Sequence, residues 1–317
     1  MREFFHNCLD VEWTDLGWCP VRCTPEQLAH YDALDGGQKV MGGRARSSAG
    51  VYLSFYTDLA TISFDYAIRF CSHDWVIFDI YENDVLTEQI KAYRQTHDHV
   101  FYQRKSANIS KVTIYLPYDC ETCLSNLELG DAMPCPEEEG PRLLALGDSI
   151  TQGMRSAMPS LTWTSILQRH LGGEMLNQGV GQACFDPELP LDVPFEPDLV
   201  TVAYGTNDVD KKDLIRLKRD VRDHLIRIKE KFGHLPIYVI TPIWRSEIGR
   251  SKFYDRKTEE ARYFIEQCAE ALDLHVIDGY QLVPHMKEFF HEDGLHPNET
   301  GFEAYAVQLI KHMMQTT

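Results

Sequence analysis

Residues 143–153 read Leu-Leu-Ala-Leu-Gly-Asp-Ser-Ile-Thr-Gln-Gly, and this stretch decides the architecture of the second half of the chain. Its four leading apolar residues are typical of a strand that is buried on both faces of a sheet. The run stops at Gly147, and Ser149 follows where the chain leaves the sheet. Ligands of open parallel sheets bind beyond the carboxyl ends of the strands, so Ser149 is the first candidate for chemistry.

Similar apolar runs follow this stretch and alternate with helix-length segments. The runs cover residues 175–180, 199–204, 237–243 and 275–277. Apolar residues at helical spacing predict helices over about 211–232, 255–272 and 299–313. Strands that are separated by helices require right-handed crossovers. The sequence therefore predicts an α/β domain with a mainly parallel sheet, covered by helices on both faces.

In the first half of the chain the apolar residues have a different spacing. Apolar residues recur at every second position over 51–55, 62–70 and 112–116, and shorter strand-like runs cover 75–81 and 99–103. This period predicts strands of an antiparallel β-sandwich. A segment rich in proline and glutamate, residues 133–141, ends the pattern. We expect an all-β domain over residues 1–135, a linker over 136–141 and the α/β domain over 142–317.

Composition excludes several classes of function. The 317 residues carry 31 basic and 48 acidic side chains, a formal net charge of −17, which argues against partners such as nucleic acid or an anionic membrane surface. No run approaches the roughly 20 apolar residues that cross a bilayer, and the first residues carry acids where a signal peptide is apolar. The expected location is the cytoplasm.

The nine cysteines have no spacing typical of a disulfide framework, and a chain of this length builds its own core. We expect them to be mostly reduced, buried thiols. Cys120, Cys123 and Cys135 form the one set that resembles a zinc site, but no fourth ligand follows at the usual spacing. The sequence therefore predicts no metal site, with zinc at these three cysteines as the alternative.

Four polar turns contain the candidate catalytic residues. Three follow predicted strands: residues 147–153, 177–182 and 205–208; the fourth, residues 293–298, lies near the C-terminus. A serine becomes a nucleophile when a base accepts its proton and a third group orients the base. Ser149 as nucleophile, His296 as base and Asp293 as orienting carboxylate meet this need. The backbone N–H groups of Ser149, Gly181 and Gln182 and the side-chain amide of Asn207 are candidates for an oxyanion hole.

Other residues near these turns are weaker candidates. Asp148, Trp244 and Arg245 are candidates to shape a substrate pocket, although Trp244 and Arg245 could equally be ordinary packing under a loop. His291 precedes Asp293 by two residues and is expected to be a solvent-exposed loop residue rather than a second base or metal ligand.

The four turns together resemble the sequence blocks of the SGNH hydrolases, also called GDSL-type esterases. The matching residues are Gly147-Asp148-Ser149-Ile150-Thr151, the turn from Gly179 to Gln182, Gly205-Thr206-Asn207-Asp208, and Asp293-Gly294-Leu295-His296-Pro297-Asn298. The resemblance covers residues 142–317. It implies a flavodoxin-like three-layer α/β/α fold and ester hydrolysis by Ser149, His296 and Asp293, with Asn207 in the oxyanion hole.

The second block departs from the family pattern. The family usually has an oxyanion glycine five residues after the asparagine that corresponds to Asn177, and this chain has Gln182 there, directly after Gly181. Any residue other than proline offers a backbone N–H, so the departure leaves open which of the two donates. Gly147-x-Ser149-x-Thr151 also lacks the second glycine of the α/β-hydrolase nucleophile elbow.

The sandwich resembles the jelly-roll or β-sandwich domain that precedes the catalytic domain of some carbohydrate-esterase-like members. The leading hypothesis is thus a metal-independent serine esterase, without a cofactor, that removes small acyl groups such as acetyl from a small-molecule or oligosaccharide ester. A lipid or thioester hydrolase that uses the same triad, of a lysophospholipase-like kind, is the alternative within enzymes. A glycan-binding protein without catalytic activity is the alternative outside them.

Overall fold

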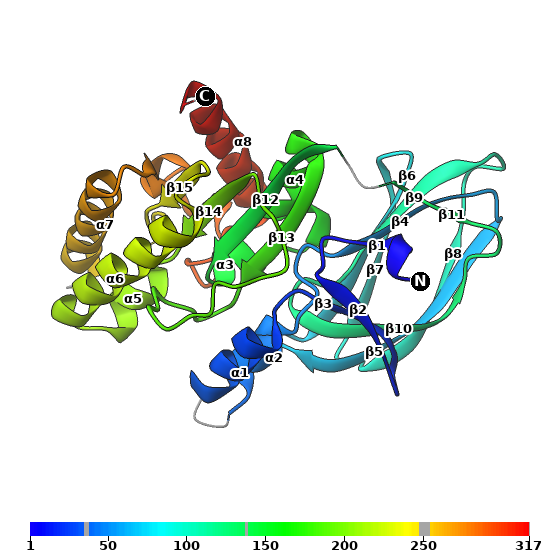
Figure 1. Cartoon of the computed structure of the whole chain (residues 1–317). Coiled ribbons are helices and arrows are strands. Elements are labelled where there is room, and N and C mark those ends of the chain that lie inside the picture. The colour runs from blue at the N-terminus through cyan, green and yellow to red at the C-terminus, as the bar shows by residue number, and fades with distance from the viewer. Residues whose placement is uncertain (35–37, 137–138, 247–253, 317) are drawn as a thin grey trace.

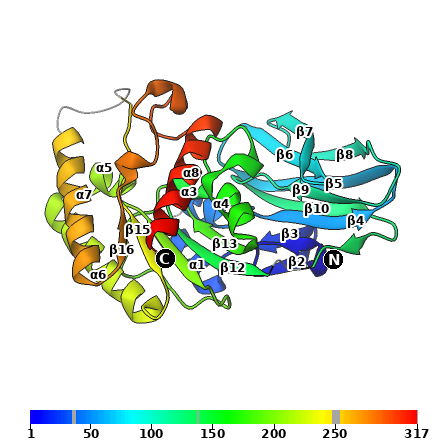
Figure 2. The same ribbon diagram turned by 90° about the horizontal axis from the view of Figure 1, so that it is seen from above.

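The computed structural model describes residues 1–34, 38–136, 139–246 and 254–316. It has two parts that lie side by side: a β-sandwich from the first half of the chain and a helix-covered sheet from the second half (Figures 1 and 2). The fold is therefore of the predicted mixed class, with antiparallel sheets before a parallel one. Residues 137–138 of the predicted linker lie outside the described residues, and the first strand of the second part already begins at Gly140.

The sheet of the second part is parallel throughout, and its strand order is β13-β12-β14-β15-β16. Its strands are β12 (Gly140–Gly147), β13 (Gly173–Gly179), β14 (Leu199–Ala203), β15 (Ile237–Ile240) and β16 (His275–Ile277). This is the flavodoxin-like order, in which the chain reverses direction across the sheet between its first and third strands. The crevice at that point lies at the carboxyl ends of β12 and β14, where the polar turns begin.

Alternation along β12 explains the two layers of helices. Leu144 and Leu146 join one apolar cluster, and Leu143 and Ala145 join the cluster on the opposite face. The first face is covered by α6 (Leu214–Phe232) and α7 (Tyr254–Ala271), and the second by α4 (Trp163–Leu171) and α8 (Glu299–Thr316). Both faces of the strand are thus buried, as its continuous apolar run predicts.

The predicted helix over 211–232 is α6 from Leu214 onward, and Lys211 ends a separate short helix before it. α5 (Thr206–Lys211) follows β14 directly, and the Asp213 side chain accepts a hydrogen bond of 2.8 Å from the N–H of Arg216 to cap the start of α6. An aspartate at this position satisfies an N–H group that has no partner within the helix. Asn207, the second residue of α5, therefore lies close to the carboxyl end of β14.

The sandwich consists of two antiparallel sheets around one apolar core. One sheet contains β1 (Phe5–His6), β4 (Tyr52–Thr57), β9 (Ser110–Tyr115), β6 (Trp75–Glu82), β7 (Val85–Tyr93) and β11 (Met133–Pro134). The other contains β2 (Asp10–Thr14), β3 (Gly17–Val21), β10 (Cys120–Glu128), β5 (Thr61–Cys71) and β8 (His97–Gln103). The polar break at residues 82–84 is a tight hairpin between β6 and β7, with positive φ at Asn83 and Asp84.

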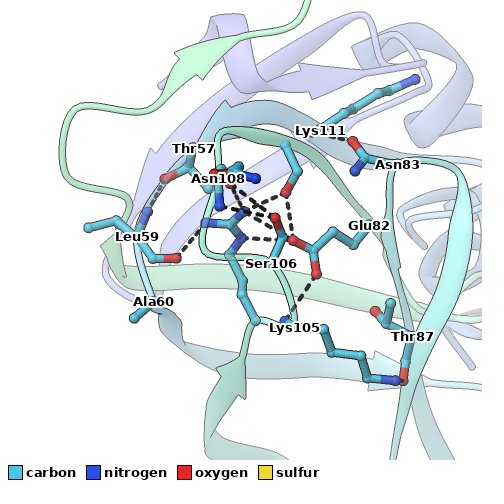
Figure 3. A network of polar contacts seen from close by, with 12 residues as sticks. Thr57, Leu59, Ala60, Glu82, Asn83, Thr87, Lys105, Ser106, Asn108 and Lys111 are labelled. Carbon is cyan, nitrogen blue, oxygen red and sulfur yellow. Dashed lines mark hydrogen bonds and ion pairs between the residues drawn. The ribbon is translucent and has the colours of Figure 1, made fainter.

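A buried ion pair fixes the end of the sandwich that contains this hairpin (Figure 3). The Arg104 guanidinium donates to Glu82 Oε1 at 3.0 Å, and both side chains are almost completely buried. The same guanidinium donates to the carbonyl of Leu59 at 2.7 Å, and the hydroxyl of Ser110 donates to Glu82 at 2.6 Å. Because the buried charges are paired and hydrogen-bonded, this network holds the surrounding loops to β6.

Two helices interrupt the all-β pattern of the first 135 residues, and the sequence analysis did not anticipate them. They are α1 (Pro25–Leu34) and α2 (Val40–Ala45), both inserted after β3. Tyr31, Met41 and Ala45 belong to the same apolar cluster as Leu144 and α6. These helices therefore pack on the α/β domain although they lie in the sandwich half of the sequence.

The prediction for the cysteines was wrong at four positions. Cys19 forms a disulfide with Cys123, and Cys71 forms one with Cys120, while the other five are not disulfide-bonded. Antiparallel pairing of β10 with β3 and β5 brings together cysteines that are 104 and 49 residues apart. The alternative zinc set is therefore not assembled, because Cys120 and Cys123 are bonded to other cysteines. None of the helices within the described ranges is both long and apolar enough to cross a membrane.

Candidate active site

Ser149 lies where β12 passes into the short helix α3 (Ser149–Gln152). The Asp148 side chain caps this helix by accepting a hydrogen bond of 2.9 Å from the N–H of Ile150. Gly147 ends the strand in a space that admits no side chain, since an added Cβ would lie 2.1 Å from Thr151 Oγ1 and 2.8 Å from the carbonyl oxygen of Ala203. The glycine thus allows the chain to turn tightly and place Ser149 at the edge of the sheet.

His296 reaches Ser149 from the loop before α8. Its Nε2 lies 2.8 Å from Ser149 Oγ, and its Nδ1 lies 2.8 Å from Asp293 Oδ2. The other carboxylate oxygen, Oδ1, accepts hydrogen bonds from the N–H groups of Leu295 and His296 at 2.9 and 3.0 Å. With the proton on Nδ1, His296 donates to Asp293 and accepts the hydroxyl proton of Ser149 through Nε2.

Burial and charge set the protonation of this pair. Burial lowers the pKa of His296, while the hydrogen bond and the charge of Asp293 act in the opposite direction. Burial raises the pKa of Asp293, but the hydrogen bond and the charge of His296 outweigh it and hold that pKa well below its usual range. His296 is therefore neutral and Asp293 ionised near neutral pH, which is the arrangement that a base with an orienting carboxylate needs.

The four candidate donors of the oxyanion hole differ in whether they already form a hydrogen bond. The N–H of Gly181 is already occupied, because it donates to Gln152 Oε1 at 2.7 Å. Within the described residues, the N–H groups of Ser149 and Gln182 donate no hydrogen bond. Asn207 Nδ2 donates to the carbonyl of Ala183 at 2.9 Å, which keeps its second amide proton beside the Gln182 turn. Gln182, at φ 74, is the member of the Gly181-Gln182 pair whose N–H remains available.

Two of the three predicted pocket residues, Asp148 and Arg245, are buried. Asp148 is 1% exposed, and burial raises its pKa to about 7; its side chain caps α3 and lines a small cavity beneath the site. Arg245 is also buried, with an ion pair of 2.9 Å to Asp210 and a hydrogen bond to the carbonyl of Thr206. Both charged side chains have partners within the fold, and their part in a substrate pocket stays a prediction.

Trp244 and His291 are both partly buried. The Trp244 ring stacks on His285, with centroids 5.2 Å apart, and contacts the edge of Phe290. His291 is not a freely exposed loop residue, because its Nδ1 lies 3.6 Å from Asp293 Oδ2 and its backbone N–H donates to the carbonyl of His296 at 2.8 Å. It therefore belongs to the turn that holds Asp293 and His296.

Several residues near the site were missed by the sequence analysis. Arg155 lies 3.6 Å from Asp293 Oδ2, and Gln152 donates to Ser47 Oγ of the first half of the chain at 2.9 Å. Arg22 is fully buried and donates to the carbonyls of Ser47 and Asn177, at 2.7 and 2.6 Å. Nothing in the local sequence marks these residues, because their partners lie far along the chain.

Comparisons with known proteins agree with this architecture. The family model of the GDSL-like lipases and acylhydrolases matches residues 145–304, which is half of the chain. No curated protein matches the chain. Because the family model contains the blocks around Ser149 and His296, the match covers the whole candidate site.

Three solved structures have a similar fold. The salicylyl-acyltransferase SsfX3 from a tetracycline biosynthetic pathway has a TM-score of 0.80 at 19% identity, over 98% of this chain and 94% of that one. A GDSL-like lipase from Bacteroides ovatus has a TM-score of 0.75 at 15% identity, over 98% and 94%. A family two carbohydrate esterase from Clostridium thermocellum, in complex with cellohexaose, has a TM-score of 0.62 at 13% identity, over 84% and 91%. With its parallel sheet, its four turns and the family match, this chain belongs to the GDSL-like lipase/acylhydrolase family.

Proposed function

We propose that this protein is a serine esterase in which Ser149 is the nucleophile, His296 the base and Asp293 the orienting carboxylate. The observation that carries the proposal is the continuous hydrogen-bond chain from Ser149 Oγ through both ring nitrogens of His296 to Asp293. Ser149 Oγ attacks the ester carbonyl while Nε2 of His296 accepts the hydroxyl proton, and the alcohol leaves with that proton. A water molecule, deprotonated by the same nitrogen, then releases the acid from the acyl-serine.

The negative charge that develops on the carbonyl oxygen needs donors that are already in place. The N–H groups of Ser149 and Gln182 and the free amide proton of Asn207 are the proposed oxyanion hole. Gly181 is left out, since its N–H holds Gln152. The departure from the family pattern at Gln182 is then tolerated, because the contribution comes from the backbone.

The proposed substrates are small acyl esters, above all O-acetyl esters, of carbohydrates. The fold is shared with carbohydrate esterases, including an acetyl xylan esterase from Butyrivibrio proteoclasticus. Trp75 and Tyr93 of the sandwich are 48% and 52% exposed, with ring centroids 5.0 Å apart, and this pair is the proposed stacking surface for a sugar ring. The net charge of −17 favours neutral over anionic substrates.

The test is a panel of acetylated mono- and oligosaccharides with wild type and Ser149→Ala, alongside an aryl acetate. We expect Ser149→Ala to lose at least about 10³-fold in kcat on every ester that wild type hydrolyses. Ser106→Ala, in a loop of the sandwich, is the matched serine control and should retain wild-type rates. Full activity of Ser149→Ala would refute the proposal. A rate that holds from acetyl to octanoyl esters would point to lipid or thioester hydrolysis instead.

A second candidate function is acyl transfer to an alcohol rather than to water. It is favoured by the likeness to SsfX3, which extends over 98% of this chain, against 84% for the carbohydrate esterase. A cavity of about 450 Å³ adjoins Gln182 between α1, α2 and the start of α6, and it offers room for an acceptor. Both functions share the acyl-serine, so analysis of products in the presence of added alcohols distinguishes them: a new ester indicates transfer and free acid alone indicates hydrolysis.

A further inference from the structure

A second histidine–carboxylate pair lies in the sandwich, and no block of the family includes it. His73 Nδ1 lies 2.8 Å from Asp119 Oδ2. The Asp119 side chain is 4% exposed and that of His73 is 18% exposed. Nε2 of His73 forms no hydrogen bond within the described residues. As in the pair of His296 and Asp293, a carboxylate binds Nδ1 of the ring and leaves Nε2 to another group.

The fold positions this pair through two neighbouring strands. His73 lies just beyond the end of β5, and Asp119 directly precedes the start of β10. Cys71 is paired with Cys120 in the ladder and bonded to it by a disulfide, and the N–H of Ser72 donates to the carbonyl of Asp119 at 3.0 Å. The imidazole is therefore held by a rigid strand end rather than by a free loop.

Contacts on both sides of the pair lead to the candidate active site. On the Asp119 side, Tyr118 donates through its hydroxyl to the carbonyl of Ser156 at 2.8 Å, next to Arg155, which lies beside Asp293. The carbonyl of Tyr118 also accepts a hydrogen bond from Gln152 of the Ser149 helix.

On the other side, Arg44 donates to Ser72 Oγ at 3.2 Å, and its Cδ packs against Gly181, 2.9 Å from where a Cβ would be. His73 thus lies between neighbours that touch the Asp293 loop and the Gln182 turn. In agreement with this position, a positive charge on the His73 ring would lower the pKa of His296.

We propose that His73 is a specificity-determining residue that accepts, through Nε2, a hydrogen bond from a hydroxyl group on the alcohol portion of the ester. The inference rests on the proposed esterase function. With the Nδ1 proton donated to Asp119, Nε2 carries a lone pair and acts as an acceptor. A hydroxyl is the donor that a neutral carbohydrate offers beside an ester. The sandwich therefore selects esters of polyols over esters of simple alcohols or phenols.

The experiment compares a mono-O-acetyl glycoside that has a free hydroxyl beside the ester with its counterpart in which that hydroxyl is a methyl ether. Wild type should prefer the free hydroxyl in kcat/KM. His73→Ala should lower this preference about tenfold, mainly through KM, because one neutral hydrogen bond of about 1.4 kcal/mol corresponds to tenfold in binding. His73→Gln, which keeps an acceptor oxygen, should recover part of the preference.

His99→Ala is the matched control, because His99 pairs with Asp65 at 2.6 Å on the same sandwich and should keep the wild-type preference. Hydrolysis of an aryl acetate and the thermal midpoint show that each variant is folded. An unchanged preference in His73→Ala, together with an inactive Ser149→Ala, refutes this inference and leaves the esterase proposal standing. Equal rates of Ser149→Ala and wild type would instead refute the proposed function itself.

Discussion

The two halves of the molecule each contain a histidine held by a buried or half-buried carboxylate, and the two pairs differ in how the chain builds them. In the α/β domain, Asp293 and His296 are three residues apart in one turn. In the sandwich, His73 and Asp119 are 46 residues apart and meet only because β5 pairs with β10. The first pair is visible as a short motif, whereas the second exists only as a consequence of strand register.

Hydrogen bonds between the two halves show the same contrast between partners that are close together and partners that are far apart in the sequence. Inside the α/β domain, the Asp148 carboxylate is satisfied by a neighbour in its own motif, the N–H of Ile150. At the boundary, Arg22, Asn7 and Asp79 each bond groups more than 80 residues away. Buried polar groups need partners, so the sandwich and the α/β domain are joined by interactions that neither sequence half shows alone.

The largest expected effect is a loss of kcat on removal of the Asp293 carboxylate, compared with removal of the Asp119 carboxylate. Asp293→Asn should lower kcat by about 10³- to 10⁴-fold on every ester, because the amide holds His296 in the wrong tautomer for a base. Asp119→Asn should cost about tenfold or less, and only on esters that carry a neighbouring hydroxyl. Steady-state kinetics on an aryl acetate and on an acetylated glycoside measure both. Equal losses for the two variants would break the distinction between the pairs.

The next largest effect is a loss of stability, expected at Arg22 on the boundary between the sandwich and the α/β domain. Arg22→Met should lower the free energy of unfolding by about 3 kcal/mol, since it leaves the buried carbonyls of Ser47 and Asn177 without their donor. Urea denaturation measures this value. Arg69→Met, which removes a more exposed arginine paired with Asp15, should change it by less than about 1 kcal/mol. Similar values for the two variants would show that the halves are not held together by this arginine.

A smaller effect is expected at the turn that departs from the family pattern. Gln182 has a φ of 74, where glycine is favoured, so Gln182→Gly should stabilise the fold by up to about 1 kcal/mol. Because the proposed oxyanion donor is the backbone N–H, kcat should stay within about twofold. Thermal unfolding and aryl-acetate kinetics test the two parts. A loss of more than tenfold in kcat would assign a role to the glutamine side chain.

The smallest effect is a shift in pH dependence. His296 acts only when neutral, and burial holds its pKa below 6.5, so activity should fall as the pH drops through a value below 6.5. The positive charge of Arg155 lowers the same pKa. Arg155→Met should therefore move the acidic limb of kcat/KM to higher pH. A shift to lower pH, or none, would show that Arg155 does not act on His296 through its charge.

How far the sequence could predict the site depends on sequence separation. Asp293, His296 and Ser149 were readable because each lies in a short polar turn after a regular element. The choice between Gly181 and Gln182 was not, because the side chain that occupies the Gly181 N–H belongs to Gln152, in another turn. The burial of Arg245 was not readable for a related reason: its partners, Thr206 and Asp210, lie in α5, more than 30 residues earlier in the chain.

The sequence by itself determined the local features of this protein: the strand and helix periods, the order of two dissimilar halves and the motifs that follow the strands. These depend on neighbouring residues, whose backbone geometry a period or a turn reveals. Only the tertiary structure decided which cysteines are bonded, that α1 and α2 join the α/β core, and that His73 pairs with Asp119. Those features depend on register and packing between residues far apart in the chain, for which no local pattern is a sign.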